Sequence, residues 1–182
     1  MKSIYIKISL VLAAFVLTMS CEPELDPSVE DDQSQLYDSG EANFDNFVAI
    51  GNSLTAGFMD GALYREGQKN SFPNIMAGQF EFAGGGEFNQ PMMNDNLGGL
   101  LLNDSLIQPN RFVLAVGENG NPAPAPLAGS PTTEITNTLS GSFNNMGVPG
   151  ARSFELTANG YGNVGNLPAA NPYFVRFASS PD

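Results

Sequence analysis

The chain has 182 residues, of which 42% are hydrophobic and 14% are charged, as in one folded domain rather than a disordered or fibrous chain. Acidic residues outnumber Lys and Arg by 19 to 7, so the chain lacks the clustered cations that a nucleic-acid partner requires. One Cys and no His exclude an internal disulfide framework, a Cys/His zinc site and any imidazole base supplied by these residues.

The first twenty residues predict an export signal, because Lys2 and Lys7 are followed by an apolar stretch over residues 8–19. That stretch is too short for a transmembrane helix, which needs about 20 apolar residues. Its end, Leu17-Thr18-Met19-Ser20-Cys21, resembles a bacterial lipoprotein cleavage box. The resemblance implies that Cys21 is lipidated and holds the protein in the bacterial cell envelope, at the outer membrane. The alternative is a free thiol beside an ordinary signal-peptide cleavage point.

Residues 21–45 carry nine acidic residues and no basic one, which predicts an acidic tether. Such a segment buries too little apolar surface to offset the entropy of ordering it, so we expect flexibility from Glu22 to about Gly40. The acidic run either resembles the export tags of some surface lipoproteins or is a linker that repels an anionic membrane. The predicted globular domain then occupies residues 46–182.

The globular part opens with the apolar run Phe47-Val48-Ala49-Ile50, which predicts a strand buried on both faces of a parallel sheet. Gly51, Asn52 and Ser53 follow at once, and after them come residues able to start a helix. In α/β enzymes this arrangement exposes a side chain at the carboxyl edge of the sheet, which makes Ser53 a candidate nucleophile. Gly51 permits the sharp turn, and the Ser53 amide can face developing negative charge.

The stretch Gly51-Asn52-Ser53-Leu54, continued by Thr55-Ala56-Gly57, resembles the Gly-Asp-Ser-Leu block of the SGNH or GDSL hydrolases. Asn52 replaces the usual Asp, which bears on the tuning of the neighbouring nucleophile. A second stretch, Asn145-Met146-Gly147-Val148-Pro149-Gly150, resembles the Asn-x-Gly-x-x-Gly block at the end of that family's second strand. The resemblance implies that Ser53 is the nucleophile and an oxyanion-hole amide, and that Gly150 is a second oxyanion-hole amide. Supporting residues are Gly51, Asn52 and Asn145.

The later blocks of that family, Gly-x-Asn-Asp and Asp-x-x-His, do not follow Gly150 in this sequence. We therefore interpret residues 46–182 as the amino-terminal part of a longer serine ester hydrolase, nearly inert without its base. The resemblance implies a three-layer α/β/α fold of flavodoxin-like type, incomplete in this chain, with an acyl ester as substrate and no cofactor. Few parallel strands leave an exposed edge, so we expect poor stability. Lys69 is an alternative base in a Ser-Lys dyad, or a solvated surface residue.

An insertion is predicted at about residues 71–140, between the two blocks. Ser71 and Pro73 predict the start of a helix that runs to Gly84. Residues 87–106 are predicted to be loop, with one short turn. Phe112 to Val116 reads as a strand, and the proline-rich segment 122–126 is excluded from a central strand.

Apolar side chains of the insertion have two interpretations: they line an acyl-binding groove over Ser53, or they pack the insertion onto the sheet. These side chains are Phe80, Phe82, Phe88, Met92, Met93 and those of residues 100–102. A competing hypothesis for function is a non-catalytic surface lipoprotein that binds glycan or protein through Gly/Asn-rich loops. Such a protein would have no need of Ser53.

Overall fold

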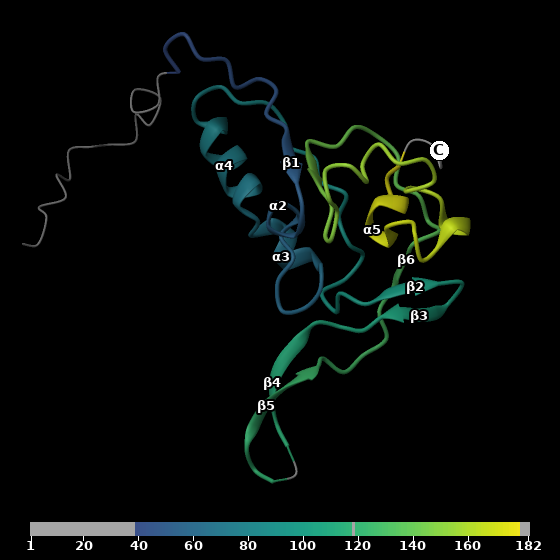
Figure 1. Ribbon diagram of the computed structural model, residues 1–182. Coiled ribbons are helices and arrows are strands. Elements are labelled where there is room, and N and C mark those ends of the chain that lie inside the picture. Colours follow the sequence, from purple (N-terminus) through teal and green to yellow (C-terminus); the bar gives the residue numbers. More distant parts are fainter. Residues whose placement is uncertain (1–38, 118, 179–182) are drawn as a thin grey trace, which may run out of the picture. The chain divides into compact units, whose positions relative to one another are not determined.

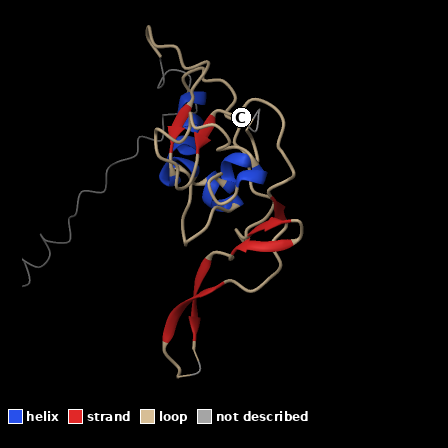
Figure 2. Cartoon of the chain, turned by 45° about the vertical axis from the view of Figure 1, so that its right-hand side comes forward, coloured by secondary structure: helices blue, strands red, loops and turns tan. Residues whose placement is uncertain are grey.

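The computed structural model describes residues 39–117 and 119–178, which belong to one unit, Ser34–Asp182 (Figure 1). The predicted signal, Cys21 and the tether up to residue 38 lie outside the described residues. The described part is a mixed α/β fold with small sheets and short helices. Figure 2 shows its strands and helices.

The two predicted blocks lie on neighbouring parallel strands. Strand β1 (Ala49–Gly51) pairs with β7 (Asn145–Gly147), with Gly51 opposite Gly147. Helix α2 (Ser53–Ala56) begins two residues after β1. The prediction that this strand is buried on both faces is wrong for the described residues, because Ala49 is 8% exposed whereas Ile50 is 73% exposed. The reason is that α2 packs on the face that Ala49 and Gly51 share, and no described element buries the opposite face, on which Ile50 lies.

Close backbone packing seats α2 against the ends of β1 and β7. A Cβ atom on Gly147 would collide with the backbone of Thr55 and Ala56, and one on Gly51 would collide with the Thr55 side chain. The buried Asn145 side chain donates from Nδ2 to the Thr55 carbonyl at 2.9 Å, and its Oδ1 accepts from the Gly147 amide at 3.0 Å. The absence of a Cβ atom at Gly51 and Gly147, together with the buried Asn145 amide group, therefore fixes the start of α2 relative to β7.

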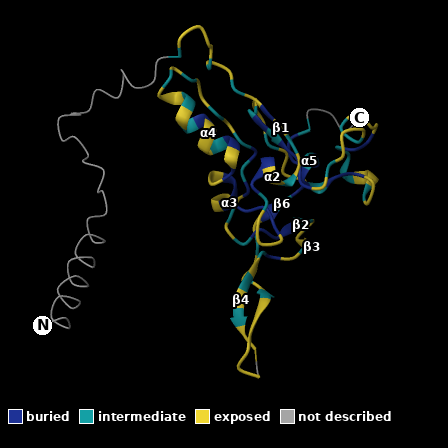
Figure 3. Cartoon of the chain, turned by 60° about the vertical axis from the view of Figure 1, so that its left-hand side comes forward, coloured by how far each residue is buried: buried dark blue, intermediate teal, exposed yellow. Residues whose placement is uncertain are grey.

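The predicted helix after Ser71 is confirmed as α4 (Phe72–Glu81), with Pro73 in its first turn. It follows the shorter α3 (Arg65–Lys69), and Figure 3 shows both buried and exposed residues along α4. The late part of the chain holds a 3₁₀ turn (Val164–Asn166) and α5 (Pro172–Val175). Asn171 caps α5, since its Oδ1 accepts from the amides of Tyr173 and Phe174.

The predicted loop over residues 87–106 is wrong at its end, where a hairpin forms. Strand β2 (Leu100–Leu102) pairs antiparallel with β3 (Ser105–Gln108) and parallel with β6 (Thr133–Glu134). The turn consists of Asn103 and Asp104, with positive φ of 50° and 63°. Asn and Asp tolerate this left-handed region, which two-residue hairpin turns require. An Asn-Asp pair between two apolar runs was the signal for this hairpin.

The predicted strand at Phe112–Val116 is confirmed as β4, which pairs antiparallel with β5 (Pro122–Pro126) in a two-stranded sheet. Two hydrogen bonds flank this pair of strands. The Gly117 amide donates to the Asn121 carbonyl, and the Leu127 amide donates to the Arg111 carbonyl. Both bonds join odd-numbered residues. The even-numbered prolines of β5 therefore face its outer edge, where a missing N–H breaks no ladder bond. Proline is tolerated here because β5 is an edge strand.

Four of the apolar side chains considered for a groove over Ser53, those of Phe80, Phe88, Met93 and Leu100, pack within the fold, whereas Phe82 is 50% exposed. Met93 and Leu100 are fully buried in the main core. Phe80 stacks on Phe44 with ring centroids 4.6 Å apart and meets Phe47 edge-on at 5.1 Å, and Phe88 stacks on Phe47 at 5.3 Å. The packing interpretation therefore holds for these four side chains, and the aromatic cluster includes residue 44 of the predicted tether.

We predict that Gly147→Ala lowers the free energy of unfolding by about 1–3 kcal/mol or more, because the added methyl group would overlap the backbone at the start of α2. The matched control is Gly78→Ala within α4, where an added Cβ has no heavy atom within 4 Å. This control should raise stability by about 0.5–1 kcal/mol, because alanine favours a helix over glycine. Urea unfolding measures both changes, and equal effects at the two positions would contradict the packing account.

Candidate active site

The structure brings the segments of Ser53 and Gly150 together at the carboxyl edge of the β1–β7 pair. The Val148 amide donates to the Gly51 carbonyl at 2.9 Å, which extends the pairing to the last residue of β1. Ser53 lies two residues beyond Gly51, and Gly150 lies three residues beyond Gly147. Gly51 and Asn145 therefore belong to the same site, as the packing partners of α2 described above.

Ser53 is the first residue of α2 and is partly exposed. Its carbonyl accepts from the Phe58 amide at 2.9 Å, which holds the helix turn closed. Within the described part of the chain, neither its hydroxyl nor its main-chain N–H has a hydrogen-bond partner. Asn52 precedes it as the N-cap, but its exposed side chain makes no capping bond. The Ser53 hydroxyl and amide are therefore available to a ligand.

Gly150 is exposed and has a φ of 80°, the left-handed region that favours glycine. A Cβ atom at this position would meet a single neighbour, Asn171 Nδ2, at 3.9 Å, so conformation rather than crowding requires glycine. The turn is closed by the Ala151 amide, which donates to the Val148 carbonyl at 3.1 Å. The Gly150 N–H has no acceptor among residues 39–117 and 119–178.

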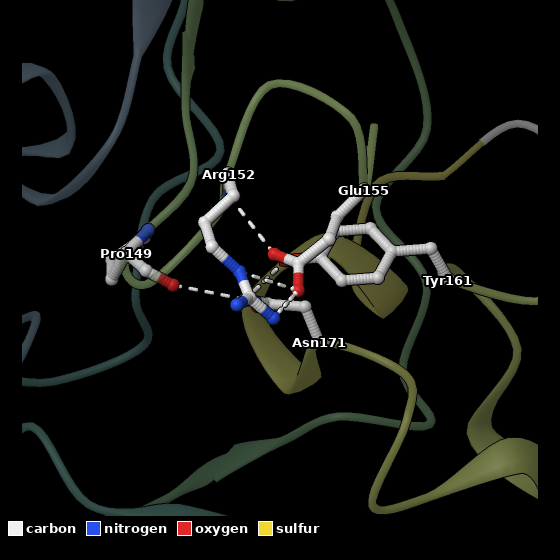
Figure 4. Close-up of polar contacts among 5 residues, drawn as sticks. All are labelled: Pro149, Arg152, Glu155, Tyr161 and Asn171. Carbon is white, nitrogen blue, oxygen red and sulfur yellow. Dashed lines mark hydrogen bonds and ion pairs between the residues drawn. The ribbon is translucent and has the colours of Figure 1, made fainter. Parts of the chain in front are cut away.

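Asn171 holds the carbonyl that precedes Gly150 (Figure 4). Its Nδ2 donates to the Pro149 carbonyl at 2.9 Å and to the Tyr161 hydroxyl at 3.0 Å. With the two amides of α5 that bond to its Oδ1, the Asn171 side chain has four hydrogen bonds at 8% exposure. This residue joins α5, the loop around Tyr161 and the turn that carries Gly150.

An ion pair continues this network toward the surface. The Tyr161 hydroxyl donates to Glu155 Oε2 at 3.4 Å, and Arg152 Nε donates to Glu155 Oε1 at 2.9 Å. The hydrogen bonds from Arg152 lower the pKa of the Glu155 carboxyl, while burial raises the pKa of the Tyr161 hydroxyl. Glu155 therefore stays an acceptor at neutral pH, and Tyr161 stays a donor.

Lys69 lies with Glu66 on the surface, where its Nζ is 2.8 Å from Glu66 Oε1 and its side chain is 53% exposed. This placement matches the surface interpretation of Lys69 rather than a buried base. The sequence analysis did not single out Asn171. Its signal was an Asn-Pro pair ahead of an apolar run, the combination that starts a helix. No group of three or more acidic side chains able to hold a metal ion occurs among the described residues.

Comparisons of the chain with known protein families, with curated proteins and with solved structures gave no match. The described residues also contain no helix with the length and apolar character needed to cross a membrane.

A small cavity lies behind the site, lined among others by Gly147, Tyr173 and Arg176. Its volume of about 10 Å³ is close to the least that holds one water molecule. Burial lowers the pKa of the Arg176 guanidinium to about 10, and Arg176 Nη2 donates to the Met92 carbonyl at 2.6 Å. Burial also raises the pKa of the Tyr173 hydroxyl to about 12, and that hydroxyl accepts from Gln108 Nε2 at 2.6 Å.

We predict that Tyr173→Phe reduces the loss of stability between pH 10 and pH 12. The folded state keeps the Tyr173 proton up to a pKa of about 12, whereas the unfolded chain releases it near the ordinary value of 10.0. The unfolded state therefore binds fewer protons in this window, and stability falls as pH rises, by at most about 2–3 kcal/mol for this group. Arg176 has the opposite sign, because burial lowers its pKa. The Tyr173 charge raises the Arg176 pKa and Arg176 lowers that of Tyr173, so the measured difference reports this coupled pair.

Guanidinium unfolding at pH 9 and pH 11.5 measures the effect. A Phe variant that loses as much stability as the original chain over this interval would show that Tyr173 ionises as freely in the fold as in the unfolded chain.

Proposed function

We propose that this chain supplies the nucleophile and two oxyanion-hole amides of a serine ester hydrolase of the SGNH type. One observation carries the proposal: Ser53 and Gly150 follow neighbouring parallel strands at the same sheet edge, and each has a main-chain N–H with no described acceptor. Polar groups at the carboxyl edge of parallel strands are the usual catalytic groups of α/β enzymes. The proposal includes a three-layer α/β/α fold of flavodoxin-like type for the whole enzyme.

In the proposed reaction the Ser53 hydroxyl oxygen attacks the acyl carbon of an ester, and its proton passes to a base. The carbonyl oxygen becomes an oxyanion that accepts from the amides of Ser53 and Gly150, each donor contributing about 10²–10³ in rate. The alcohol leaves with the proton, and water then releases the acyl group from Ser53. Since these 182 residues contain no His, the imidazole base of the proposal comes from outside them.

The supporting residues act on the position of the nucleophile. Gly51 and Gly147 let the start of α2 approach both strands, and Asn145 ties the Thr55 carbonyl of that helix to β7. Asn52 presents an exposed side chain immediately before Ser53. These contacts fix the helix turn that presents the hydroxyl, which matters because small misplacements of reacting groups cost large factors in rate.

The proposed location follows from Cys21. A lipidated Cys21 would hold the protein at the bacterial outer membrane, and the acidic tether would separate the folded part from the lipid surface. The substrate would then be an acyl ester that reaches the cell envelope, and the chemistry needs no cofactor.

The test supplies the missing base from solution. The 182-residue chain with Cys21→Ser, which removes the competing thiol, is incubated with p-nitrophenyl acetate and imidazole, and peptide mass spectrometry measures acetylation of each serine. We expect Ser53 to be acetylated at least about tenfold faster than the exposed Ser105, because the two amides stabilise its oxyanion. Ser53→Ala should abolish the labelled peptide and leave Ser105 unchanged. Equal labelling of Ser53 and Ser105 would refute the proposal.

A second candidate, a binding lipoprotein, is favoured by one observation. Phe112, Leu114 and Val116 share one face of β4 and are 43%, 75% and 73% exposed. Exposed apolar rows of this kind occur at protein interaction sites. Leu114→Lys would weaken such binding without changing the acetylation of Ser53, so the two functions can be separated.

A further inference from the structure

We infer that Asn171 is a positioning residue of the oxyanion site, which sets the direction of the Gly150 N–H through the preceding carbonyl. The inference rests on the proposed function for the task of that amide. The geometry itself, the bond from Asn171 Nδ2 to the Pro149 carbonyl at 2.9 Å, does not depend on it.

The Pro149 carbonyl and the Gly150 N–H belong to one planar peptide unit. The one cis peptide bond among the described residues is Leu167-Pro168, so the unit before Gly150 is trans. In a trans unit the C=O and the N–H point in opposite directions. A donor that holds the Pro149 oxygen on the inner side therefore turns the Gly150 N–H to the opposite, exposed side, where a substrate oxygen can reach it.

The backbone of Gly150 cannot by itself hold its N–H in this direction. At a φ of 80°, with open space around its Cβ position, Gly150 has the conformational freedom that lets the preceding peptide unit rotate. Asn171 opposes that rotation because its own side chain is fixed at both ends: Nδ2 donates twice and Oδ1 accepts twice. At 8% exposure, water has little access to replace these bonds.

Tyr161 and Glu155 continue the hydrogen-bond network of Asn171 toward the surface. The Tyr161 hydroxyl accepts one Asn171 proton, which leaves the other Nδ2 proton directed at the Pro149 carbonyl. Tyr161 in turn donates to Glu155, whose carboxylate is held by Arg152. Figure 4 shows these side chains in contact, in sequence from the surface ion pair to the peptide before Gly150.

The test uses Asn171→Asp, which keeps the acceptor oxygen that caps α5 but replaces the donating Nδ2 with a second oxygen. Nitrogen-15 relaxation in the 182-residue chain measures the order parameter of the Gly150 N–H. We expect a value of about 0.85 in the original chain, as in rigid backbone, and a fall to about 0.6 or less in the variant. The matched control is Asn94→Asp, because Asn94 Nδ2 also donates to a carbonyl, that of Thr132 at 2.9 Å, outside the site.

The second readout is imidazole-dependent acetylation of Ser53, which should fall about 10–100-fold in Asn171→Asp because one oxyanion donor is misdirected. Tyr161→Phe should give a smaller loss, and Tyr64→Phe, whose hydroxyl donates to Asp60, should give none. If Ser53 is not acetylated in the original chain, the proposed function fails while the relaxation experiment still decides the role of Asn171. An unchanged Gly150 order parameter together with unchanged acetylation overturns the inference and leaves the function standing.

Asn171→Ser separates the loss of positioning from a loss of the fold. Serine caps a helix well, but its side chain is too short to reach the Pro149 carbonyl. It should reproduce the effects of Asn171→Asp on the Gly150 order parameter and on acetylation, while the amide resonances of Tyr173 and Phe174 keep their chemical shifts. A serine variant with a rigid Gly150 amide would contradict the inference.

Discussion

The described fold depends on one close approach, that of the α2 backbone to the ends of β1 and β7. Gly51 and Gly147 stand opposite each other in the parallel pair, and at both positions α2 fills the space that a Cβ atom would need. The buried Asn145 then ties the Thr55 carbonyl to β7. Because Ser53 is the first residue of α2, the same contacts that close the sheet edge also fix the presentation of its hydroxyl.

The second half of the site depends on side chains rather than on close backbone packing. Gly150 has open space around it and a left-handed φ, so its own packing does not restrain it. The restraint comes from the Asn171 amide group, which is also the cap of α5. The two halves of the candidate site are therefore held by different interactions: close backbone packing at α2, and side-chain hydrogen bonds from Asn171 at the turn of Gly150.

The sequence predicted the elements whose signals are local. The strand before Ser53, the helix after Ser71 and the strand at Phe112–Val116 follow from apolar runs, a proline in a first turn and glycine or proline at their ends. The β2–β3 hairpin was missed because its turn residues, Asn103 and Asp104, are a weaker hairpin signal than Asn-Gly. The exposure of Ile50 could not be foreseen either, since an apolar strand has the same composition whether one or two of its faces are covered.

Among the site residues, Ser53 and Gly150 could be proposed from their short blocks, whereas Asn171 could not. The positioning role that we infer for Asn171 depends on a contact with Pro149, 22 residues earlier, and no local signal encodes that contact. The difference between oxyanion donors and a catalytic base has a physical basis. Oxyanion donors must be placed within a few tenths of an ångström before substrate binds, so they belong to backbone held by packing and buried hydrogen bonds. A base acts through a longer side chain and can come from a distant part of the sequence. Under the proposed function, a chain that contains the two amides but no histidine would hold the oxyanion part of the site, and imidazole from solution would replace the base in the acetylation test.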